Sequence, residues 1–330
     1  VADLLGRKRS MVLSRLCIAI SCVIMLFARS FWFFALSFVV QALGNNLNSG
    51  SEEALVYDSM KAAGQEAHYM RVCGRLNMLI EVSQGIATVA GGILAEFSYV
   101  WCYSACLVIA VLALMPVFLM VEAPYAEEQS RPRSIREVVA AHFRTCYEIL
   151  RSDRRILKLI SYYAVIFASE TMLFFYSQQY YYELGYNKIQ ISLILLVVGG
   201  VSCIGAVMSV RIYAALGTKT AQIGACVIAA AFLIYGVQRL YLSIAAFAAA
   251  SFFNSVLYPV QSEQLNSLIP SAQRATLISV NSMFFSIGMI LLFPLAGFLA
   301  DVWGLTAVLV GTGGVLLGFM GIWCCIDIYS

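Results

Sequence analysis

Long apolar segments recur along almost the whole chain, and each is long enough to cross a lipid bilayer. They lie near residues 11–28, 31–56, 76–97, 101–121, 156–177, 189–211, 220–237, 241–262, 276–299 and 304–326. A membrane-spanning helix needs roughly 20 apolar residues, whereas a barrel strand needs about ten. Because backbone groups inside hydrocarbon must be hydrogen-bonded within their own segment, the sequence predicts about ten transmembrane helices. The expected fold class is an all-α polytopic membrane protein.

The composition excludes several other classes of protein. Hydrophobic residues make up 61% of the chain and charged residues 12%, with a mean hydropathy of +0.84, whereas soluble domains have roughly 45–50% and 25%. The ten cysteines are scattered through apolar segments and there are two histidines, so we expect no disulfide scaffold, metal site or cofactor. A net charge of +3 is explained by membrane topology, so no nucleic-acid partner is expected. Without an intramembrane histidine we do not expect an enzyme.

The basic residues are distributed unevenly between the two sides of the membrane. If the helices alternate in direction, one side receives only Arg29, Lys188 and Arg239, and the other side receives all the remaining lysines and arginines. Cytoplasmic loops carry the excess of basic residues in membrane proteins. We therefore expect a multi-pass protein of the plasma membrane with both ends in the cytoplasm.

A long polar segment divides the apolar segments into two groups. Residues 123–155 contain prolines and charges before an amphipathic stretch, as is typical of a linker with a surface helix. We predict a first bundle at 1–122, a basic cytoplasmic linker at 123–155 and a second bundle at 156–330. An internal repeat supports this division, because Gly92–Glu96 in the first bundle aligns with Gly297–Asp301 in the second.

The start of the chain carries a family signature, in Asp3-Leu4-Leu5-Gly6-Arg7-Lys8. This segment resembles the cytoplasmic loop G-x-x-x-D-x-x-G-R-[KR] of the major facilitator superfamily, which joins the second and third of twelve transmembrane helices. The resemblance covers the entire chain and implies two pseudo-symmetric bundles containing family helices three to twelve. Since the chain begins at Val1 instead of methionine, we expect an N-terminally truncated sequence.

Two further signatures of the family are present only in part. Gln41-Ala42-Leu43-Gly44 matches a pattern of the fourth family helix but lacks its arginine. In the fifth family helix, Ala87 and Thr88 stand where the antiporter signature has Gly-Pro. The small residues around them still predict close helix packing, but the specific indication of antiport is lost.

The resemblance implies that family helices one, four, seven and ten surround a central substrate cavity. Polar stripes lie on single faces of two of these helices: Gln41, Asn45, Asn48 and Glu52 in the fourth, and Asn254, Tyr258 and Gln261 in the tenth. Pro259 in the second stripe can expose a backbone carbonyl. Such stripes line a wet cavity or form hydrogen bonds between helices, and both interpretations stay open.

The seventh family helix contains a carboxyl group, Glu170, near the middle of its apolar segment. A charge at mid-membrane costs roughly 2.5–3.5 kcal/mol on insertion scales, so such a residue is a functional candidate. Proton uptake on one side and release on the other would bias the two bundle orientations, and a neutral acid satisfied by a neighbouring helix is the alternative. We add Tyr163, Phe174 and Gln178 to the predicted cavity. Phe174 also begins an aromatic run to Tyr182 that is typical of an interfacial belt.

Other charged residues are assigned to coupling or gating. Glu81 in the fifth family helix is a second candidate for proton coupling, with an ion pair to Arg71 or Arg75 as the alternative. The family uses cytoplasmic residues as a latch whose charge pairs form and break as the bundles rock. The matching residues of this chain are Asp3, Gly6, Arg7, Lys8 and Asp58, with Glu263 in the second half. Exposed pairs contribute only about 0–1 kcal/mol, so plain helix-end charges are the alternative.

These observations predict a secondary active transporter that works by alternating access. Its expected partners are the lipid bilayer, a small-molecule substrate and H⁺, and we expect a monomer. The glycines at 311–314 lie in an apolar segment without the Lys-Ser/Thr of a nucleotide-binding loop. Glu170 and its aromatic surroundings favour proton-coupled efflux of an amphipathic or drug-like compound. Import of a sugar or other nutrient is one alternative, and a non-transporting membrane sensor with the same fold is another.

Overall fold

The structure is a computed structural model, and the part of the chain that it describes is helical and contains no strand. The described residues are 7–48, 55–56, 59–60, 62–65, 68–120, 154–268 and 274–325. The chain divides into two units, Val1–Arg131 and Pro132–Ser330, and the division falls inside the predicted linker 123–155. Residues 123–153 of this linker lie outside the described residues. Each unit is therefore described by itself.

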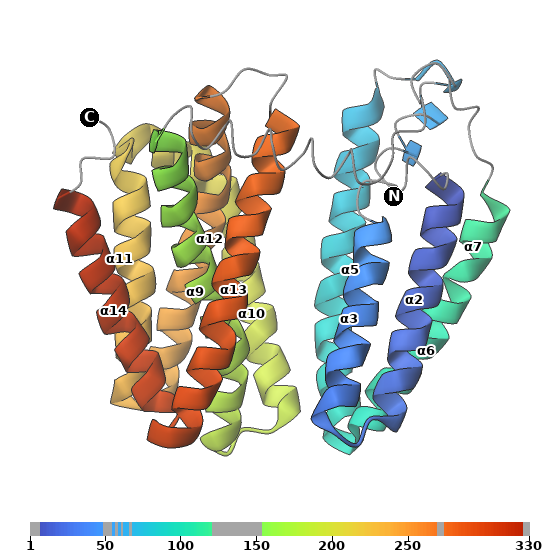
Figure 1. The fold of residues 1–330 in the computed structure, drawn as a ribbon, viewed down its shortest axis with the longest axis horizontal. Helices are drawn as coiled ribbons and strands as arrows, with labels where there is room; N and C mark the ends of the chain where they lie inside the picture. The colour runs from blue at the N-terminus through green and yellow to red at the C-terminus, as the bar shows by residue number, and fades with distance from the viewer. Residues whose placement is uncertain are drawn as a thin grey trace. The chain divides into compact units, whose positions relative to one another are not determined.

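The first unit contains α2 (Arg7–Phe27), α3 (Phe31–Asn48), α5 (Tyr69–Phe97), α6 (Tyr99–Leu112) and α7 (Leu114–Leu119), shown from blue to green in Figure 1. Small side chains lie where α2 and α3 meet. Ser37 Oγ donates a hydrogen bond to the backbone oxygen of Ser21 at 2.9 Å. A Cβ on Gly44 would lie 3.0 Å from the backbone oxygen of Ser14. The two helices therefore approach as closely as small residues allow.

Local sequence determines where α5, α6 and α7 begin and end. Ser98 is the residue between α5 and α6, and its hydroxyl accepts a hydrogen bond from the backbone N–H of Val100 at 3.2 Å. This is the N-cap interaction that serine favours. α6 ends at Leu112, four residues before Pro116, which has no N–H to donate to the Leu112 carbonyl. The fourth predicted span is consequently divided into α6 and α7.

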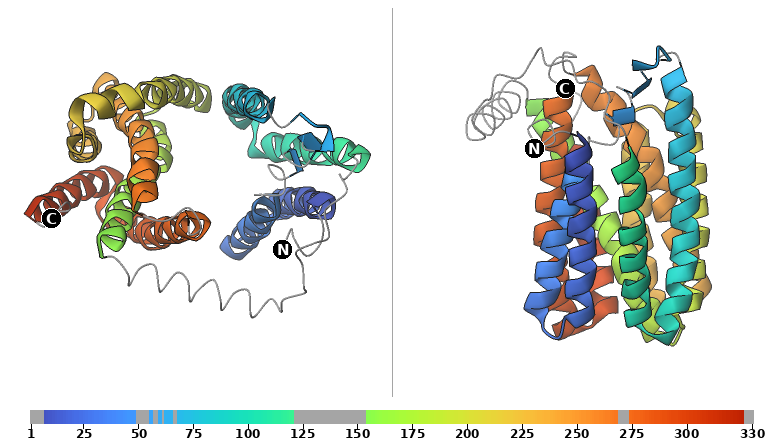
Figure 2. Two further views of the ribbon diagram at one scale, coloured as in Figure 1. Left: turned by 90° about the horizontal axis from the view of Figure 1, so that it is seen from above. Right: turned by 90° about the vertical axis from the view of Figure 1, so that its right-hand side faces the viewer.

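The second unit contains α9 (Arg154–Glu183), α10 (Lys188–Leu216), α11 (Lys219–Ile234), α12 (Leu240–Ser267), α13 (Arg274–Trp303) and α14 (Leu305–Cys325). A short 3₁₀ turn, η3 (Tyr235–Val237), follows α11. Seen from above in Figure 2, α9 and α12 lie side by side in the middle of this unit. Asn187 and Gln190 form a capping box at the start of α10.

The hydrophobic core of the second unit is centred on α9. Its largest fully buried side chains are Tyr162, Tyr163, Tyr180, Tyr181, Tyr235, Phe232, Phe247, Ile156, Ile160, Ile166, Met172 and Leu173. Most of them belong to α9, and 67% of its most apolar 18-residue stretch is buried, the largest share among the candidate spans of the described residues. Buried polar side chains of α9, such as Glu170 and Ser177, must therefore find their hydrogen-bond partners within the protein.

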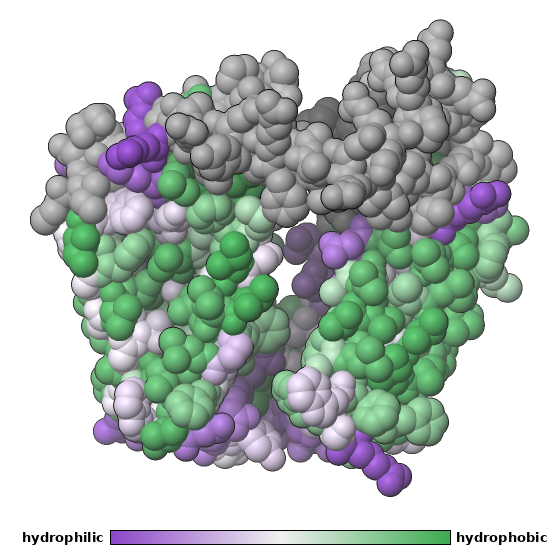
Figure 3. All heavy atoms as spheres, viewed as in Figure 1, coloured by the Kyte–Doolittle hydropathy of each residue, from purple (hydrophilic) through white to green (hydrophobic). Residues whose placement is uncertain are grey.

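Helices occupy all ten predicted apolar segments, and nine spans among the described residues are long and apolar enough to cross a membrane. The remaining segment, 31–56, contains α3, which is helical but is not among the nine, because Gln41, Asn45, Asn46 and Asn48 make its second half polar. Figure 3 shows apolar side chains over the middle of the helices and hydrophilic ones near their ends. The prediction of an all-α polytopic membrane protein is confirmed.

The aromatic run of α9 does not form a continuous interfacial belt. Phe175 and Tyr182 are exposed, whereas Tyr180 and Tyr181 are buried against Tyr235. The ring centroids of Tyr180 and Tyr235 are 4.7 Å apart, and the Tyr180 hydroxyl donates to the Tyr235 backbone oxygen at 3.2 Å. The belt interpretation is wrong for these two tyrosines because they point into the core.

Candidate functional site

Glu170 lies inside the second unit, where α9 faces α12. Its side chain is 5% exposed, and Ser251 Oγ of α12 donates a hydrogen bond to its Oε1 at 2.8 Å. At 1.5 Å per residue, Glu170 is about 24 Å from Arg154 and about 20 Å from Glu183, near the middle of the helix. No cation interacts with the carboxyl group among the described residues. Burying an ionised carboxyl group without a cation costs more free energy than burying a neutral one.

A second polar contact joins the same two helices. Tyr163, two turns before Glu170, is fully buried, and its hydroxyl donates to Gln264 Oε1 at 2.9 Å. The Tyr163 ring packs beside Phe167, and the Phe167 ring centroid lies 6.2 Å from that of Tyr258. Tyr258 is 69% exposed, so this row of aromatic rings extends from the core of the second unit to its surface.

The remaining members of the α12 stripe differ in their surroundings. Gln261 is buried, and its Nε2 donates to Asn281 Oδ1 on α13 at 2.8 Å. The Asn281 amide donates back to Gln261 Oε1 at 3.4 Å, which makes the pair reciprocal. The Oδ1 of Asn254 is buried without a hydrogen-bond partner among the described residues. The stripe thus combines an interhelical contact, an exposed ring and an unsatisfied acceptor.

Phe174 and Gln178 lie on α9, one and two turns beyond Glu170. Phe174 is half-buried and packs edge-to-face on Phe247 of α12, with ring centroids 6.0 Å apart. Gln178 is also half-buried, and its Nε2 donates to the Phe174 backbone oxygen at 3.3 Å. The structure therefore places Tyr163, Glu170 and Phe174 against α12, whereas the Gln178 side chain bonds within its own helix.

The predicted site residues of the first unit lie on its helix surfaces or outside the described residues. Gln41 and Asn45 are exposed on α3, Asn48 is half-buried, and Glu52 lies outside the described residues. Glu81 is exposed on α5, and among the described residues it has no ion-pair partner. The described cavity residues of this unit, Gln41, Asn45 and Asn48, all lie on α3.

The predicted latch is only partly described. Asp3, Gly6 and Asp58 lie outside the described residues, and of Arg7 the structure describes the backbone alone, as the first residue of α2. Lys8 Nζ donates to the backbone oxygen of Phe118 at 2.8 Å, near the end of α7. A cation at this position complements the carbonyls of a helix C-terminus. Glu263 is exposed on α12. The latch thus stays a prediction.

Sequence reasoning missed the partners of the polar groups in the second unit. Ser251, Gln264 and Asn281 contact Glu170, Tyr163 and Gln261, respectively. Gln264 follows Gln261 by three residues and thus extends the polar stripe, which is a signal that could have been used. Ser251 and Asn281 gave no such signal, because isolated small polar residues are common in apolar helices.

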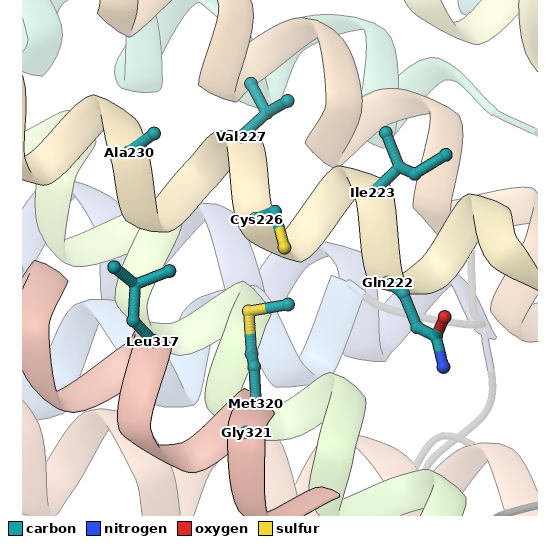
Figure 4. A pocket seen from close by; sticks show the side chains of 8 residues that line it. All are labelled: Gln222, Ile223, Cys226, Val227, Ala230, Leu317, Met320 and Gly321. Atoms are coloured by element: carbon teal, nitrogen blue, oxygen red, sulfur yellow. The ribbon is translucent and has the colours of Figure 1, made fainter. Parts of the chain in front are cut away.

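A groove on the second unit is separate from these residues. It lies between α11 and α14, has a volume of about 660 Å³, and is lined by Gln222, Ile223, Cys226, Val227, Ala230, Leu317, Met320 and Gly321 (Figure 4). None of the predicted site residues lines it. Its lining is almost entirely apolar, as expected of a surface that faces lipid.

Comparison with known proteins identifies the family. The sequence profile of the Major Facilitator Superfamily matches residues 1–237, which is more than half of the chain. The chain belongs to the Major Facilitator Superfamily. The resemblance of the N-terminal segment is thereby confirmed, and this membership points to a transporter and not to an enzyme. No curated protein matches the chain significantly.

Solved structures share the fold of this superfamily member. A mutant of the nucleoside transporter NupG superposes with a TM-score of 0.81 at 11% identity, covering 100% of this chain and 85% of that one. A bacterial homologue of the human lysosomal transporter Spinster, inward-facing and unoccupied, gives 0.77 at 15% identity, with 97% and 82% covered. A D-xylose-proton symporter gives 0.67 at 16% identity, with 97% and 81% covered. At these identities the likeness establishes the fold alone.

Proposed function

We propose that this superfamily member is a proton-coupled secondary transporter in which Glu170 is the proton-binding group. The observation that carries the proposal is the position of Glu170, buried near the middle of α9 and hydrogen-bonded to Ser251 of α12. A xylose-proton symporter among the structures of similar fold makes proton coupling a reasonable mode for this fold. Alternating access then needs a protonation step whose energy differs between the two bundle orientations.

The free-energy difference that deprotonation of Glu170 creates between the two bundle orientations can be estimated. An ionised carboxyl at mid-membrane costs roughly 2.5–3.5 kcal/mol on insertion scales. Once the proton has left, a conformation that buries Glu170 would therefore be higher in free energy, by that amount, than a conformation that exposes it to water. Since about 1.4 kcal/mol corresponds to a tenfold change, loss of the proton shifts the equilibrium between conformations roughly a hundredfold. A shift of this size converts a ratio of about 1:10 between the two conformations into about 10:1.

We propose an amphipathic or drug-like compound as the substrate and efflux as the direction. Support comes from the aromatic row Tyr163, Phe167 and Tyr258, whose exposed member Tyr258 offers an apolar ring, while Phe167 lies one turn before Glu170 on α9. Such surroundings suit a ligand with an apolar ring and a cationic group. The uneven distribution of basic residues supports a cytoplasmic position for both chain ends and for the predicted linker.

Proton release in membrane vesicles tests this function. Inverted vesicles from plasma membranes that contain the protein are acidified, and collapse of the proton gradient is recorded as cationic drugs and then sugars are added. We expect a cationic amphipathic drug to release protons through the unmodified protein but not through Glu170→Gln, which keeps the size of the side chain and removes its charge. Glu183→Gln is the matched control, because Glu183 is an exposed glutamate at the end of the same helix.

Each outcome has a distinct meaning. Drug-induced release that survives in Glu170→Gln would refute the role of Glu170. Proton movement in response to sugars alone would favour nutrient import over efflux. The reciprocal amide pair Gln261–Asn281 would then be a suitable hydroxyl-binding group. If no compound causes proton movement, the proposal of proton coupling is refuted and a non-transporting membrane sensor is favoured.

A further inference from the structure

Asn254 of α12 carries a buried oxygen atom that no hydrogen bond satisfies. Its Oδ1 is enclosed by the second unit and has no hydrogen-bond partner among the described residues. Buried side-chain oxygens of native proteins are in large majority hydrogen-bonded, because an unpaired one has lost its water without compensation. The surroundings of Asn254 therefore decide which donor could pair with it.

Helix geometry places Asn254 on the face of α12 that packs against α9. On this face, Phe247 is fully buried and packs edge-to-face on Phe174 of α9, with ring centroids 6.0 Å apart. Asn254 follows Phe247 by seven residues, nearly two full turns, so the two side chains project from the same side. It also follows Ser251 by three residues, a spacing that makes side chains neighbours on a helix surface.

Contacts on either side of Asn254 give its level along α9. One turn before it, Ser251 Oγ donates to Glu170 Oε1 at 2.8 Å. One turn after it, the Tyr258 ring lies 6.2 Å from that of Phe167, centroid to centroid. Asn254 is therefore opposite the turn of α9 that runs from Phe167 to Glu170 and its successor.

In this turn of α9, Glu170 is the polar residue that has an oxygen left for Asn254. Thr171 Oγ1 already donates to the Phe167 backbone oxygen at 2.8 Å, and the Ser169 side chain projects about 100° away from that of Glu170. Ser251 is the one hydrogen-bond partner of Glu170 among the described residues, and it occupies Oε1. Glu170 Oε2 and Asn254 Oδ1 are thus two oxygens without a partner at the same interface between α9 and α12.

We propose that Asn254 accepts a hydrogen bond from the protonated carboxyl group of Glu170 and so holds the proton in place. Two acceptor oxygens cannot pair unless one of them carries a hydrogen, and a single proton on Oε2 pairs both. Ser251 donates to Oε1, while the Oε2–H group donates to Asn254 Oδ1. Asn254 is then a positioning residue of the proton site, and this assignment rests on the proposed function of Glu170.

Charged side chains of the described helices in the second unit are far from this interface. They lie within about two turns of a helix end, and none of them interacts with Glu170. They are Arg154, Arg155, Lys158 and Glu183 of α9, Lys188 and Arg211 of α10, Lys219 of α11, Arg239 and Glu263 of α12, and Arg274 and Asp301 of α13, whereas α14 has none. The titratable Tyr163 on the same face of α9 bonds to Gln264. Proton binding at Glu170 therefore depends on burial and on uncharged hydrogen-bonding groups.

Infrared spectroscopy of the purified protein tests the proposal. The carbonyl stretch of a protonated carboxyl group moves to higher wavenumber when its O–H group loses a hydrogen-bond acceptor. The band of Glu170 is identified as the one that disappears in Glu170→Gln. We expect Asn254→Leu, which keeps the branched shape and removes the acceptor, to raise the wavenumber of this band. Half of the band should then require a proton concentration roughly two- to tenfold higher.

Thr171→Val is the matched control, because it removes a half-buried hydroxyl from the same turn of α9 whose hydrogen bond goes to the Phe167 backbone. It should leave both the wavenumber and the titration of the Glu170 band unchanged. Asn254→Ala removes the same acceptor without a bulky side chain and should shift the band in the same direction as Asn254→Leu, so the result does not depend on how leucine packs.

The outcomes separate this proposal from the proposed function. An unshifted band in both Asn254 variants, or half of the band at an unchanged or lower proton concentration, would overturn the role of Asn254 and leave Glu170 as a proton-binding group. If no band disappears in Glu170→Gln at any pH at which the protein stays folded, Glu170 binds no proton and the proposed function fails as well. The assay involves no transport, so substrate and direction do not affect it.

Discussion

Replacing Gly205 by alanine should destabilise the second unit, because α10 and α12 meet backbone to backbone at this glycine. A Cβ at position 205 would overlap the backbone oxygen of Phe252 and lie 3.1 Å from its carbonyl carbon. The hydroxyls of Ser202 and Ser255 hydrogen-bond nearby across the same interface. Since the obstacle is main chain, no side-chain rotation can make room for the methyl group. The two helices would have to separate.

The size of the effect follows from two opposing contributions. Overpacking of a well-packed interface costs about 1–3 kcal/mol. A glycine inside a helix is otherwise less favourable than alanine by roughly 0.5–1 kcal/mol, so an unobstructed substitution stabilises the helix. For a unit of this size, a change of 1 kcal/mol shifts the melting temperature by roughly 2–4 °C. Subtracting the gain from the cost leaves a net loss of about 0–2.5 kcal/mol, so we expect Gly205→Ala to lower the melting temperature by up to roughly 10 °C.

Gly200→Ala is the matched control, because a Cβ at Gly200 on the same helix has no heavy atom within 4 Å. Each variant is heated in detergent, and the fraction that remains monodisperse is measured by size-exclusion chromatography. The control should match or exceed the melting temperature of the unmodified protein. Equal melting temperatures for the two variants would refute the close approach of α10 and α12 at Gly205.

Two further predictions concern buried hydrogen bonds of the second unit. Tyr235→Phe removes a buried hydroxyl that hydrogen-bonds to Ser177 Oγ at 2.6 Å, and should lower the free energy of unfolding by about 1–3 kcal/mol in a thermal unfolding assay. Tyr182→Phe, at an exposed position, is the control and should leave this free energy unchanged. A double-mutant cycle of Gln261→Ala and Asn281→Ala should give a coupling energy of about 0.6–1.7 kcal/mol in the same unfolding assay; additive effects would argue against the reciprocal pair.

The positions of the helices could be predicted from the sequence because a bilayer imposes a minimum length on each apolar segment. The division of the fourth span at Ala113 could also have been read from Pro116. The depth of Glu170 followed from its place in an apolar run, but its partner Ser251 did not. One sequence contains no information about which helices are neighbours, so a serine in an apolar helix cannot be assigned to one face or to another.

The misreading of Tyr180 and Tyr181 has a geometric cause. Successive residues of a helix differ in direction by about 100°, so consecutive aromatic side chains point to different sides. Residues of one such run therefore divide between lipid and core, as Tyr182 and Tyr181 do. Composition located the run at the end of a span, but only the packing of Tyr235 against it decides which rings are buried.

The contact between Glu170 and Ser251 also bears on how the protein is made. α9 is the least apolar of the nine candidate spans found among the described residues, and Glu170 and Ser251 are 81 positions apart in the sequence. At about 5–20 residues per second, the ribosome reaches Ser251 roughly 4–16 s after Glu170. During that interval α9 holds a carboxyl group without its α12 donor. α9 therefore depends on a helix that is synthesised later, and slow translation between α9 and α12 would prolong its exposure to quality-control proteases.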